Sequence, residues 1–323
     1  MNAILGFDTS CYTTSAALAT LEGEILCSSR RLLTVPAGER GLMQSEGLFQ
    51  HVSRLPEILE VALREAAGAE IVAVAASVRP RPREDSYMPV FRAGESQARS
   101  AAALLGVPFY PVSHQEGHVR AALVDSGIDR KQPFLALHLS GGTTEMLLSD
   151  GSGLTLLGGS LDLSAGQLID RIGVFLNLGF PAGPEMERLA LRGTAEGRIG
   201  VSIRGCNCCI AGAENKAKGF LASGGLTPED AAAEVFDFLA RTVERMIEAG
   251  CGETGCRQAL LAGGVASSRL FGFLVRARAE KRRLRCRICF ARPELSGDNA
   301  AGVALLGADR WWAEQEVLHG HSD

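Results

Sequence analysis

The sequence predicts an α/β protein made of two related halves. Strand-like and helix-like segments alternate along the chain, which is the pattern of α/β proteins. A strand, a turn of small polar residues and a second strand occur at Phe7–Leu18 and again at His138–Leu148. With 323 residues, the chain is long enough for about two domains of roughly 150 residues each.

The first half is expected to contain five strands and two helices. Short runs of apolar, often β-branched residues predict the strands. These runs lie at Ala3–Asp8, Ser15–Thr20, Gly23–Leu33, Ile71–Ser77 and Phe109–Val112. Apolar residues recur at helical spacing within Leu48–Ala67, which predicts a helix there, and a second helix is expected over Gly94–Leu105.

Three turns of the chain are candidates for binding phosphate. Two of them join strand pairs, within Phe7–Leu18 and at Ser140-Gly141-Gly142-Thr143, and they gather N–H groups and hydroxyls at one point. The third, Gly263-Gly264, lies between an apolar strand that starts at Gln258 and the start of a helix, whose N–H groups favour an anion. Ordinary β-hairpins are the alternative for the first two turns taken alone.

Composition and charge exclude several classes of protein. Lysine and arginine number 33 against 37 aspartate and glutamate residues, and this mild acidity argues against indiscriminate nucleic-acid binding, although it permits a local basic patch. No segment approaches the ~20 apolar residues of a membrane span, and the first residues do not resemble a signal peptide. We therefore expect a cytoplasmic protein that does not bind membranes.

The nine cysteines are an odd number in a chain without an export signal, so most are expected to be reduced thiols. Cys206–Cys209 and Cys286–Cys289 together offer enough sulfur for a zinc or iron–sulfur site. The second cluster lies in a strand-like stretch, where alternate side chains face opposite ways, and this disfavours such a site.

Two histidines form a candidate metal site. His114 and His118 stand four residues apart, so on a helix they share one face and can bind one ion, although an incidental pair is the commoner explanation. The zinc-protease pattern is not met, because it needs glutamate directly after the first histidine and Glu116 stands elsewhere. Asp298, in a turn before an expected helix, is a candidate third ligand, with a simple helix N-cap as the alternative.

Five motifs, taken in order, resemble one family. They are Asp8-Thr9-Ser10-Cys11, His114-Gln115-Glu116-Gly117-His118, Ser140-Gly141-Gly142, Ala262-Gly263-Gly264-Val265 and Ala291–Asn299. The chain resembles the threonylcarbamoyl transferase family of tRNA modification, formerly called glycoprotease or O-sialoglycoprotein endopeptidase, from Gly6 to about Leu306. The resemblance implies an actin/sugar-kinase/Hsp70-like (ASKHA) fold with two similar α/β domains around a nucleotide cleft. The domains would cover residues 1–125 and 126–299, and a last helix over about 300–316 would pack on the first.

The resemblance also implies an activity. The family transfers the threonylcarbamoyl group from threonylcarbamoyl-AMP to N6 of the adenosine next to the tRNA anticodon. The implied cofactors are one divalent metal ion, iron or zinc, and a nucleotide ligand, threonylcarbamoyl-AMP or ATP/AMP. The implied partners are tRNA, a paralogous ASKHA protein and an ATPase.

Carried over by position, the family's metal ligands match His114, His118 and Asp298. The loop that holds the phosphate region of the substrate matches Leu139, Ser140, Gly141, Gly142 and Thr143. Asp170 matches the acid that binds the ribose, and Gly183 matches a glycine against which the nucleoside packs. Ser268 stands in a nucleotide-contacting turn where the family has asparagine. No residue is assigned a catalytic role.

Several positions depart from the family pattern. Tyr12 and Thr13 replace an Asp-Glu pair, Thr143 replaces histidine, and Gln167 replaces glutamate. Ser77–Asp85 replaces a Gly-Pro-Gly segment. Because the metal ligands are kept while these residues change, the resemblance supports the fold more strongly than the reaction.

Two basic segments are candidates for contact with tRNA phosphates: the loop around Arg79, Arg81 and Arg83, and Lys281–Arg285. A solvated loop and a helix C-terminus are the alternatives.

Two functions are therefore in contention: the enzyme that acts on tRNA, and a non-catalytic paralogue that binds a nucleotide and a partner protein. Tyr12, Thr143 and Ser268 favour the paralogue. A peptidase is disfavoured because the sequence shows neither a nucleophile–base pair nor the zinc-protease pattern.

Overall fold

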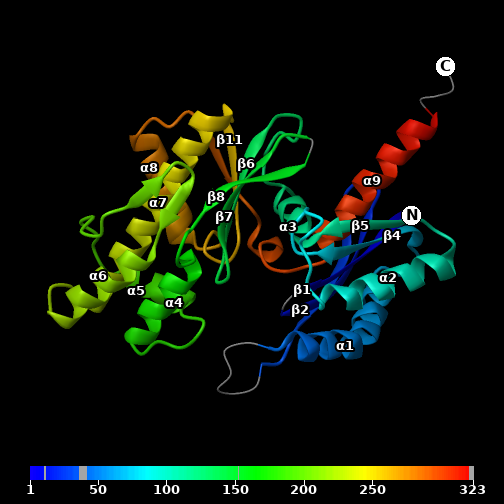
Figure 1. Cartoon of the computed structure of the whole chain (residues 1–323), viewed down its shortest axis with the longest axis horizontal. Helices are drawn as coiled ribbons and strands as arrows, with labels where there is room; N and C mark the ends of the chain where they lie inside the picture. The colour runs from blue at the N-terminus through cyan, green and yellow to red at the C-terminus, as the bar shows by residue number, and fades with distance from the viewer. Residues whose placement is uncertain (11, 36–41, 152, 320–323) are drawn as a thin grey trace. The chain divides into compact units, whose positions relative to one another are not determined.

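A computed structural model of the chain describes residues 1–10, 12–35, 42–151 and 153–319. The chain divides into two compact units, Met1–Ala121 with Gly297–Asp323 (unit 1) and Ala122–Ser296 (unit 2). Each unit contains a five-stranded sheet with helices packed against it (Figure 1). The predicted α/β class is confirmed.

Unit 1 contains a sheet with the strand order β3-β2-β1-β4-β5. Its strands are β1 (Asn2–Ser10), β2 (Thr13–Thr20), β3 (Ile25–Leu32), β4 (Glu70–Arg79) and β5 (Phe109–Ser113). β2 is antiparallel to both of its neighbours, β1 and β3, whereas β4 runs parallel to both β1 and β5. All five predicted strands are present. The first hairpin is longer than predicted, because its hydroxyl residues pair in the ladder as far as Ser10 and Thr13; Cys11 lies outside the described residues.

The helices of unit 1 cover both faces of this sheet. They are α1 (Gln44–Glu65), α2 (Phe91–Leu105), α3 (His114–Ala122) and α9 (Ala301–His319). Alternate residues of β1 face opposite ways, so Leu5 and Phe7 pack with the cluster that includes α1 and α2, whereas Ile4 packs with the cluster that includes α9. Both predicted helices are present, and α1 and α2 begin a few residues earlier than expected.

Unit 2 repeats the sheet of unit 1. Its strands are β6 (Phe134–Leu139), β7 (Thr144–Ser149), β8 (Leu154–Gly159), β11 (Gln258–Ala262) and β12 (Arg287–Phe290), in the order β12-β11-β6-β7-β8. β7 is antiparallel to both of its neighbours, β6 and β8, and β11 runs parallel to both β6 and β12. Because in both sheets the strands pair antiparallel on one side of the central strand and parallel on the other, the prediction of two related halves is confirmed.

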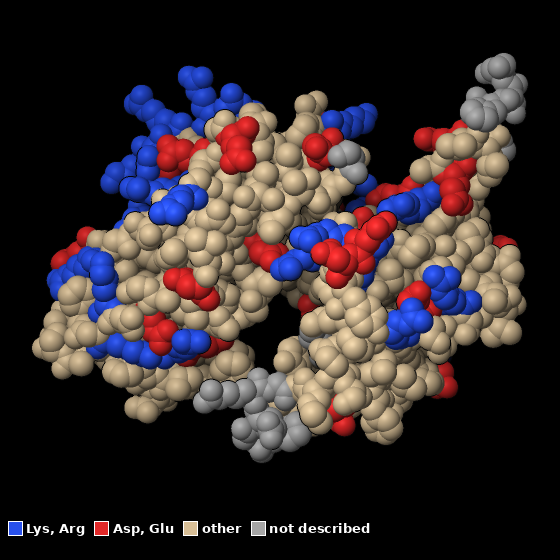
Figure 2. Space-filling model, viewed as in Figure 1, with Lys and Arg blue, Asp and Glu red and all other residues tan. Residues whose placement is uncertain are grey.

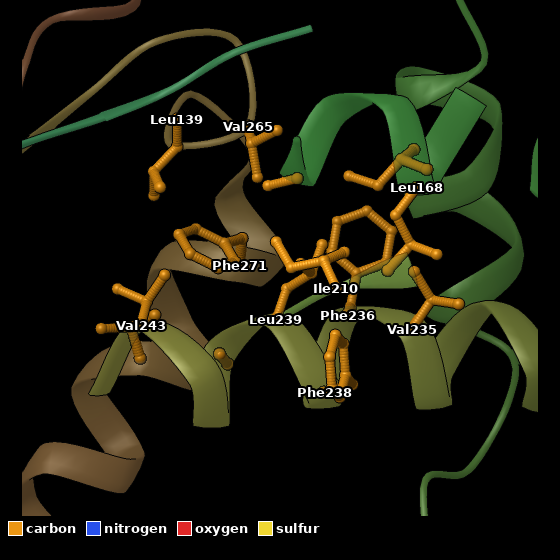
Figure 3. Packing of buried hydrophobic residues seen from close by; sticks show 14 of the residues in the cluster. Leu139, Leu168, Ile210, Val235, Phe236, Phe238, Leu239, Val243, Val265 and Phe271 are labelled. Carbon is orange, nitrogen blue, oxygen red and sulfur yellow. The ribbon is translucent and has the colours of Figure 1, made fainter. Parts of the chain in front are cut away.

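The longest helix of unit 2 lies at the centre of its core. The helices are α4 (Ala165–Phe175), α5 (Gly183–Ala190), α6 (Ala211–Ala222), α7 (Pro228–Thr254) and α8 (Arg269–Lys281), and a short hairpin joins β9 (Ser202–Arg204) to β10 (Asn207–Cys209). α7 begins at the N-cap Thr227, with proline in its first turn, and ends at Gly255 in the left-handed conformation. Phe236, Leu239 and Val243 on α7 pack in the same buried cluster as Phe271 of α8 (Figure 3).

Candidate metal centre and nucleotide site

His114 and His118 lie on one helix, as the spacing requires for a shared metal ion. α3 follows β5 directly, and its first turn is closed by a reciprocal pair of hydrogen bonds. The N–H of Ser113 donates to the Glu116 carboxylate at 2.8 Å, and the N–H of Glu116 donates to the Ser113 hydroxyl at 3.2 Å. This capping box explains the position of Glu116 and fixes where the helix begins.

Asp298 lies in the segment before α9. The N-cap alternative is wrong, because the side chain of Asn299 accepts the N–H of Ala301 at 3.0 Å. The Asp298 carboxylate instead lies 3.0 Å from His118 Nε2 and 3.5 Å from His114 Nε2 through Oδ1. Its Oδ2 accepts a hydrogen bond from the Thr13 hydroxyl at 3.3 Å.

A pair of glycines lets α3 approach the start of α9 closely. A Cβ on Gly302 would lie only 1.9 Å from the carbonyl oxygen of Gly117. Gly117 stands between the two histidines, and Gly302 follows Asp298 by four positions. This contact between helix backbones therefore places Asp298 against His114 and His118.

The spacing of the three side chains fits a single metal ion. Bonds from zinc to nitrogen are roughly 2.0–2.1 Å long, so two ligand atoms at angles of roughly 90–120° on one ion lie roughly 2.9–3.6 Å apart. The Nε2 atoms of His114 and His118 are 2.9 Å apart, and their distances to Asp298 Oδ1 are 3.5 and 3.0 Å. Among the described residues, these three are the one group of three or more potential ligands close enough to share an ion.

The other ring nitrogen of His114 faces a buried carboxylate. Asp8, at 1% exposure, places Oδ2 at 2.9 Å from His114 Nδ1, and its Oδ1 accepts a hydrogen bond from the Ser77 hydroxyl. A carboxylate behind a ligand histidine fixes the ring and makes its other nitrogen a better ligand. The three candidate ligands are thus held in place by Asp8, Ser77 and Thr13, which the sequence did not assign to the metal group. For Asp8, a carboxylate at the end of the first buried strand was the signal that the sequence offered.

The charges around the group favour a cation. Burial by itself would lower the pKa of His114, but the charges and hydrogen bonds of Asp8 and Asp298 outweigh it and raise this pKa well above its ordinary value. Burial would raise the pKa of Asp298, but the hydrogen bonds and charges of the two histidines hold it well below its ordinary value. Without an ion, two carboxylates thus favour a proton on His114, and a divalent cation can replace that positive charge.

The predicted phosphate loop, Leu139–Thr143, lies in unit 2 at the end of β6. The Ser140 hydroxyl accepts the N–H groups of Gly142 and Thr143, and the carbonyl of Ser140 accepts the N–H of Gly166 at 3.1 Å. Gly141 and Gly142 are exposed, and a Cβ on either would meet no atom within 4 Å. The loop therefore leaves open space beside its backbone.

Two further elements meet at this loop. A Cβ on Gly263 would lie 2.3 Å from the carbonyl oxygen of Leu139, so the Gly263-Gly264 turn packs directly on the end of β6. A Cβ on Gly166, in the first turn of α4, would lie 2.7 Å from Gly141 Cα. Gln167, which replaces the family's glutamate, closes a capping box with Ser164 at the start of this helix. The two predicted phosphate turns of unit 2 and a helix N-terminus therefore come together.

Asp170 and Gly183 are also brought together. Asp170 lies on α4, and its Oδ1 accepts the N–H of Ala182 at 2.8 Å, directly before Gly183. Burial raises the pKa of Asp170, and the bond from Ala182 offsets only part of this effect. A Cβ on Gly183 would meet no atom within 4 Å, which is the open surface that a packed nucleoside needs.

Ser268 is the N-cap of α8, where its hydroxyl accepts the N–H of Phe271 at 3.1 Å. Two residues later, the N–H of Leu270 donates to Glu187 of α5 at 2.7 Å, which ties the start of α8 to the helix that begins at Gly183. The predicted nucleotide residues therefore all lie in unit 2, and the predicted metal ligands all lie in unit 1. Their roles in binding remain predictions.

No described helix has the length and apolar content that a membrane-spanning segment would need.

Comparisons with known structures show the fold. HypF from T. kodakarensis superposes with a TM-score of 0.64 at 16% identity and covers 97% of this chain and 48% of that one. A ROK family glucokinase from Streptomyces griseus has a TM-score of 0.55 at 14% identity and covers 94% of this chain and 98% of that one. With the repeated sheet, these likenesses confirm the ASKHA-type duplicated α/β fold.

Comparisons of sequence show the family. A family model described as TsaD, tRNA N6-adenosine threonylcarbamoyltransferase, matches residues 41–305. The enzyme of this name from Aromatoleum aromaticum is 31% identical in an alignment 329 positions long, which covers 97% of this chain and 92% of the relative. Its counterpart from Methanopyrus kandleri is 31% identical in an alignment 309 positions long, which covers 94% of this chain and 86% of the relative. The resemblance read from the motifs is confirmed, and the chain belongs to the tRNA N6-adenosine threonylcarbamoyltransferase family.

Proposed function

We propose that the protein transfers a threonylcarbamoyl group from threonylcarbamoyl-AMP to N6 of the adenosine next to the tRNA anticodon. The observation that carries this proposal is the group of His114, His118 and Asp298, whose spacing fits one ion in a chain of this family. In the reaction, N6 attacks the carbamoyl carbon, the bond from that carbon to the phosphate oxygen breaks, and AMP leaves.

Two histidines and a carboxylate suit iron or zinc and leave coordination positions open for a substrate oxygen. Bound there, the cation would stabilise negative charge on the carbamoyl or phosphate oxygens. The residues of the chain hold and orient it: Asp8 fixes the ring of His114, and Thr13 holds the free oxygen of Asp298. In this proposal Thr13 acts by position and not as an acid.

The nucleotide is proposed to bind in unit 2. The Ser140–Thr143 loop, the Gly263-Gly264 turn and the first turn of α4 meet at the C-terminal ends of β6 and β11, where N–H groups and a helix N-terminus favour the phosphate. In this proposal Asp170, which lies beside Ala182, accepts hydrogen bonds from ribose hydroxyls, and the nucleoside occupies the open space at Gly183. Because adenosine N6 is a poor nucleophile, positioning supplies a large part of the rate.

A basic surface at the end of α8 supports binding of tRNA. Lys281, Arg283, Arg285 and Arg287 are exposed. Figure 2 shows blue side chains gathered in the part of the view where Figure 1 labels α8. Phosphates of RNA bind such clusters through release of counterions. The family resemblance adds a paralogous ASKHA protein and an ATPase as proposed partner subunits.

A non-catalytic paralogue is the second candidate function. It is favoured by the replacement of the family's Asp-Glu pair by Tyr12, which is exposed, and Thr13. Thr143 and Ser268, also departures from the family, use their polar groups in the turn and in the helix cap. Such a protein would bind the adenylate and a partner without transfer.

A single assay separates the two functions. Metal-loaded protein, threonylcarbamoyl-AMP, unmodified tRNA and the partner subunits of the host are incubated, and the nucleosides of the digested tRNA are measured by mass spectrometry. The enzyme yields threonylcarbamoyladenosine, and His118→Ala loses it. Binding of the adenylate by calorimetry together with no product would contradict the enzyme and support the paralogue.

A further inference from the structure

Ser10 carries a buried hydroxyl that has no hydrogen-bond partner. It is the last residue of β1, and its exposure is only 2%. The hydroxyl oxygen is shielded from solvent, and no group in the described part of the chain bonds to it. Because a buried hydroxyl without a partner costs free energy, this atom is expected to meet a ligand that the chain itself does not supply.

The pairing of β1 with β2 places the side chain of Ser10 on the face of the metal group. Ser10 pairs directly with Thr13, and the side chains of such partners point to the same face of a sheet, with Cβ atoms roughly 5 Å apart. The Thr13 hydroxyl donates to the Asp298 carboxylate at 3.3 Å. Asp8 stands two positions before Ser10 on β1 and therefore shares its face. The Asp8 carboxylate lies 2.9 Å from His114 Nδ1, so both neighbours of Ser10 on this face contact the metal group.

The opposite face of the same hairpin uses its hydroxyls within the fold. Thr9 and Thr14 pair across the strands next to Ser10 and face the helices. The Thr9 hydroxyl donates to the carbonyl of Val90 at 3.0 Å, and the Thr14 hydroxyl hydrogen-bonds to His51 on α1 at 2.8 Å. These two side chains therefore fasten the sheet to α1 and to the start of α2, a role that the Ser10 hydroxyl does not share.

The carboxylates of the metal group already receive other hydroxyls. Asp8 accepts a hydrogen bond from Ser77, and Asp298 accepts one from Thr13. The Ser10 hydroxyl is thus left to donate to an oxygen that a ligand brings to the group. The adenylate of the proposed reaction carries two anionic groups, the carboxylate of its threonine part and its phosphate, and an anionic oxygen accepts a stronger hydrogen bond than a neutral one.

We propose that Ser10 is a substrate-binding residue whose hydroxyl donates a hydrogen bond to a carboxylate or phosphate oxygen of the ligand at the metal group. This role rests on the proposed function, because the ligand is held where His114, His118 and Asp298 would bind an ion. The hydroxyl has no partner until the ligand binds, so Ser10 serves the ligand and not the stability of the free protein.

The test is a titration of the cobalt(II)-loaded full-length protein with sodium acetate and, separately, with inorganic phosphate. The visible absorption of cobalt changes when an anion binds beside the ion. Ser10→Ala should weaken the binding of one of the two anions by at least about tenfold, which is the loss of one hydrogen bond to a charged group. The anion that is weakened identifies the group that Ser10 binds. The affinity for zinc, measured by competition with a chelator, should stay within twofold, because Ser10 is not one of the three metal ligands.

A matched variant separates ligand binding from support of the fold. Ser15 on β2 is equally buried, but its hydroxyl donates to the carbonyl of Asp8 at 3.1 Å. Ser15→Ala should therefore lower the midpoint of urea unfolding of the metal-free protein and leave anion binding unchanged, whereas Ser10→Ala should leave this midpoint unchanged or raise it.

Two results would overturn the role given to Ser10 and leave the proposed function standing. One is equal affinity of the wild type and Ser10→Ala for both anions. The other is a fall in the unfolding midpoint of Ser10→Ala as large as that of Ser15→Ala, without a loss of anion binding. A wild-type protein that takes up no cobalt would instead overturn the metal site and the role of Ser10 together.

Discussion

Asp8→Asn tests whether the buried carboxylate prepares His114 for a metal ion. The substitution keeps the size of the side chain and removes its charge. If the new amide donates to Nδ1 of His114, the ring proton moves to Nε2, the atom that faces His118 and Asp298. If the amide oxygen faces the ring instead, the neutral acceptor leaves Nε2 a weaker ligand.

The expected loss follows from this single contact. Removing the hydrogen-bond partner of a ligand histidine typically weakens metal binding about 10–100-fold. At 25 °C this is about 1.4–2.7 kcal/mol of binding free energy. Zinc affinity is measured by competition with a chromophoric chelator at fixed pH, and circular dichroism establishes that the variant is folded.

The matched control is Asp85→Asn. Asp85 pairs with Arg83 on the surface, with a side chain that is 70% exposed, and is not part of the metal group. Its variant should bind zinc as the wild type does. A folded Asp8→Asn protein with zinc affinity within twofold of the wild type would refute the role given to Asp8.

Three further predictions concern packing, charge and pH. Gly302→Ala forces α9 away from Gly117, so it should lower the free energy of unfolding by about 1–3 kcal/mol and weaken metal binding. Gly219→Ala, in open space on α6, should have neither effect. Thermal unfolding and zinc titration measure the two quantities. Arg283→Glu should make the plot of the logarithm of tRNA affinity against the logarithm of salt concentration less steep, by about 1 in slope. Arg64→Glu on α1 should leave the slope unchanged. Burial lowers the pKa of His51 from 6.5 to about 4, so the free energy of unfolding should fall by about 3 kcal/mol between pH 6.5 and pH 4. The His51→Gln variant should lack this fall. Equal pH profiles of the two proteins in urea unfolding would contradict the prediction.

The sign of the His51 effect follows from its surroundings. This buried histidine hydrogen-bonds through Nδ1 to the Thr14 hydroxyl at 2.8 Å. Below pH 6.5 the unfolded chain takes up a proton that the folded chain does not, and the difference grows until the folded histidine titrates near pH 4. Stability from this residue is therefore present above pH 6.5 and is lost as the pH falls.

The strands and helices were predictable where burial imposes a regular pattern. The runs at Ala3–Asp8 and Ile71–Ser77 are β-branched or apolar, and both became central strands. The ends of elements were less predictable. Thr9 to Thr14 read as a turn because small hydroxyl residues favour turns, but the cross-strand pairing of Ser10 with Thr13 extends the ladder.

The candidate metal group was predictable only in part. The i, i+4 spacing gives two histidines one face of a helix, so their proximity follows from the sequence. The place of Asp298 does not, because it depends on the contact between Gly117 and Gly302, which no local pattern reveals. The partnership of Asp8 with His114 likewise arises from a strand end and a helix start that are remote in sequence and adjacent in the fold.

The cysteines show the same limit. The sequence offered Cys206–Cys209 with Cys286–Cys289 as a possible sulfur site and disfavoured it. In the structure the sulfur of Cys206 lies 3.5 Å from the Glu253 carboxylate, and the sulfur of Cys286 lies 3.9 Å from the carbonyl oxygen of Arg287. The parallel pairing of β11 with β12 places Cys289 beside Leu260, and cysteine spacing alone does not contain this neighbour.

His114, His118 and Asp298 are expected to hold one metal ion. Crystals of the purified protein, measured at the absorption edges of iron and zinc, provide the direct test. One anomalous peak is expected, bonded to the Nε2 atoms of both histidines and to the Asp298 carboxylate, with no peak in His118→Ala. A peak at the cysteines of unit 2 alone, or a metal retained in full by His118→Ala, would contradict it.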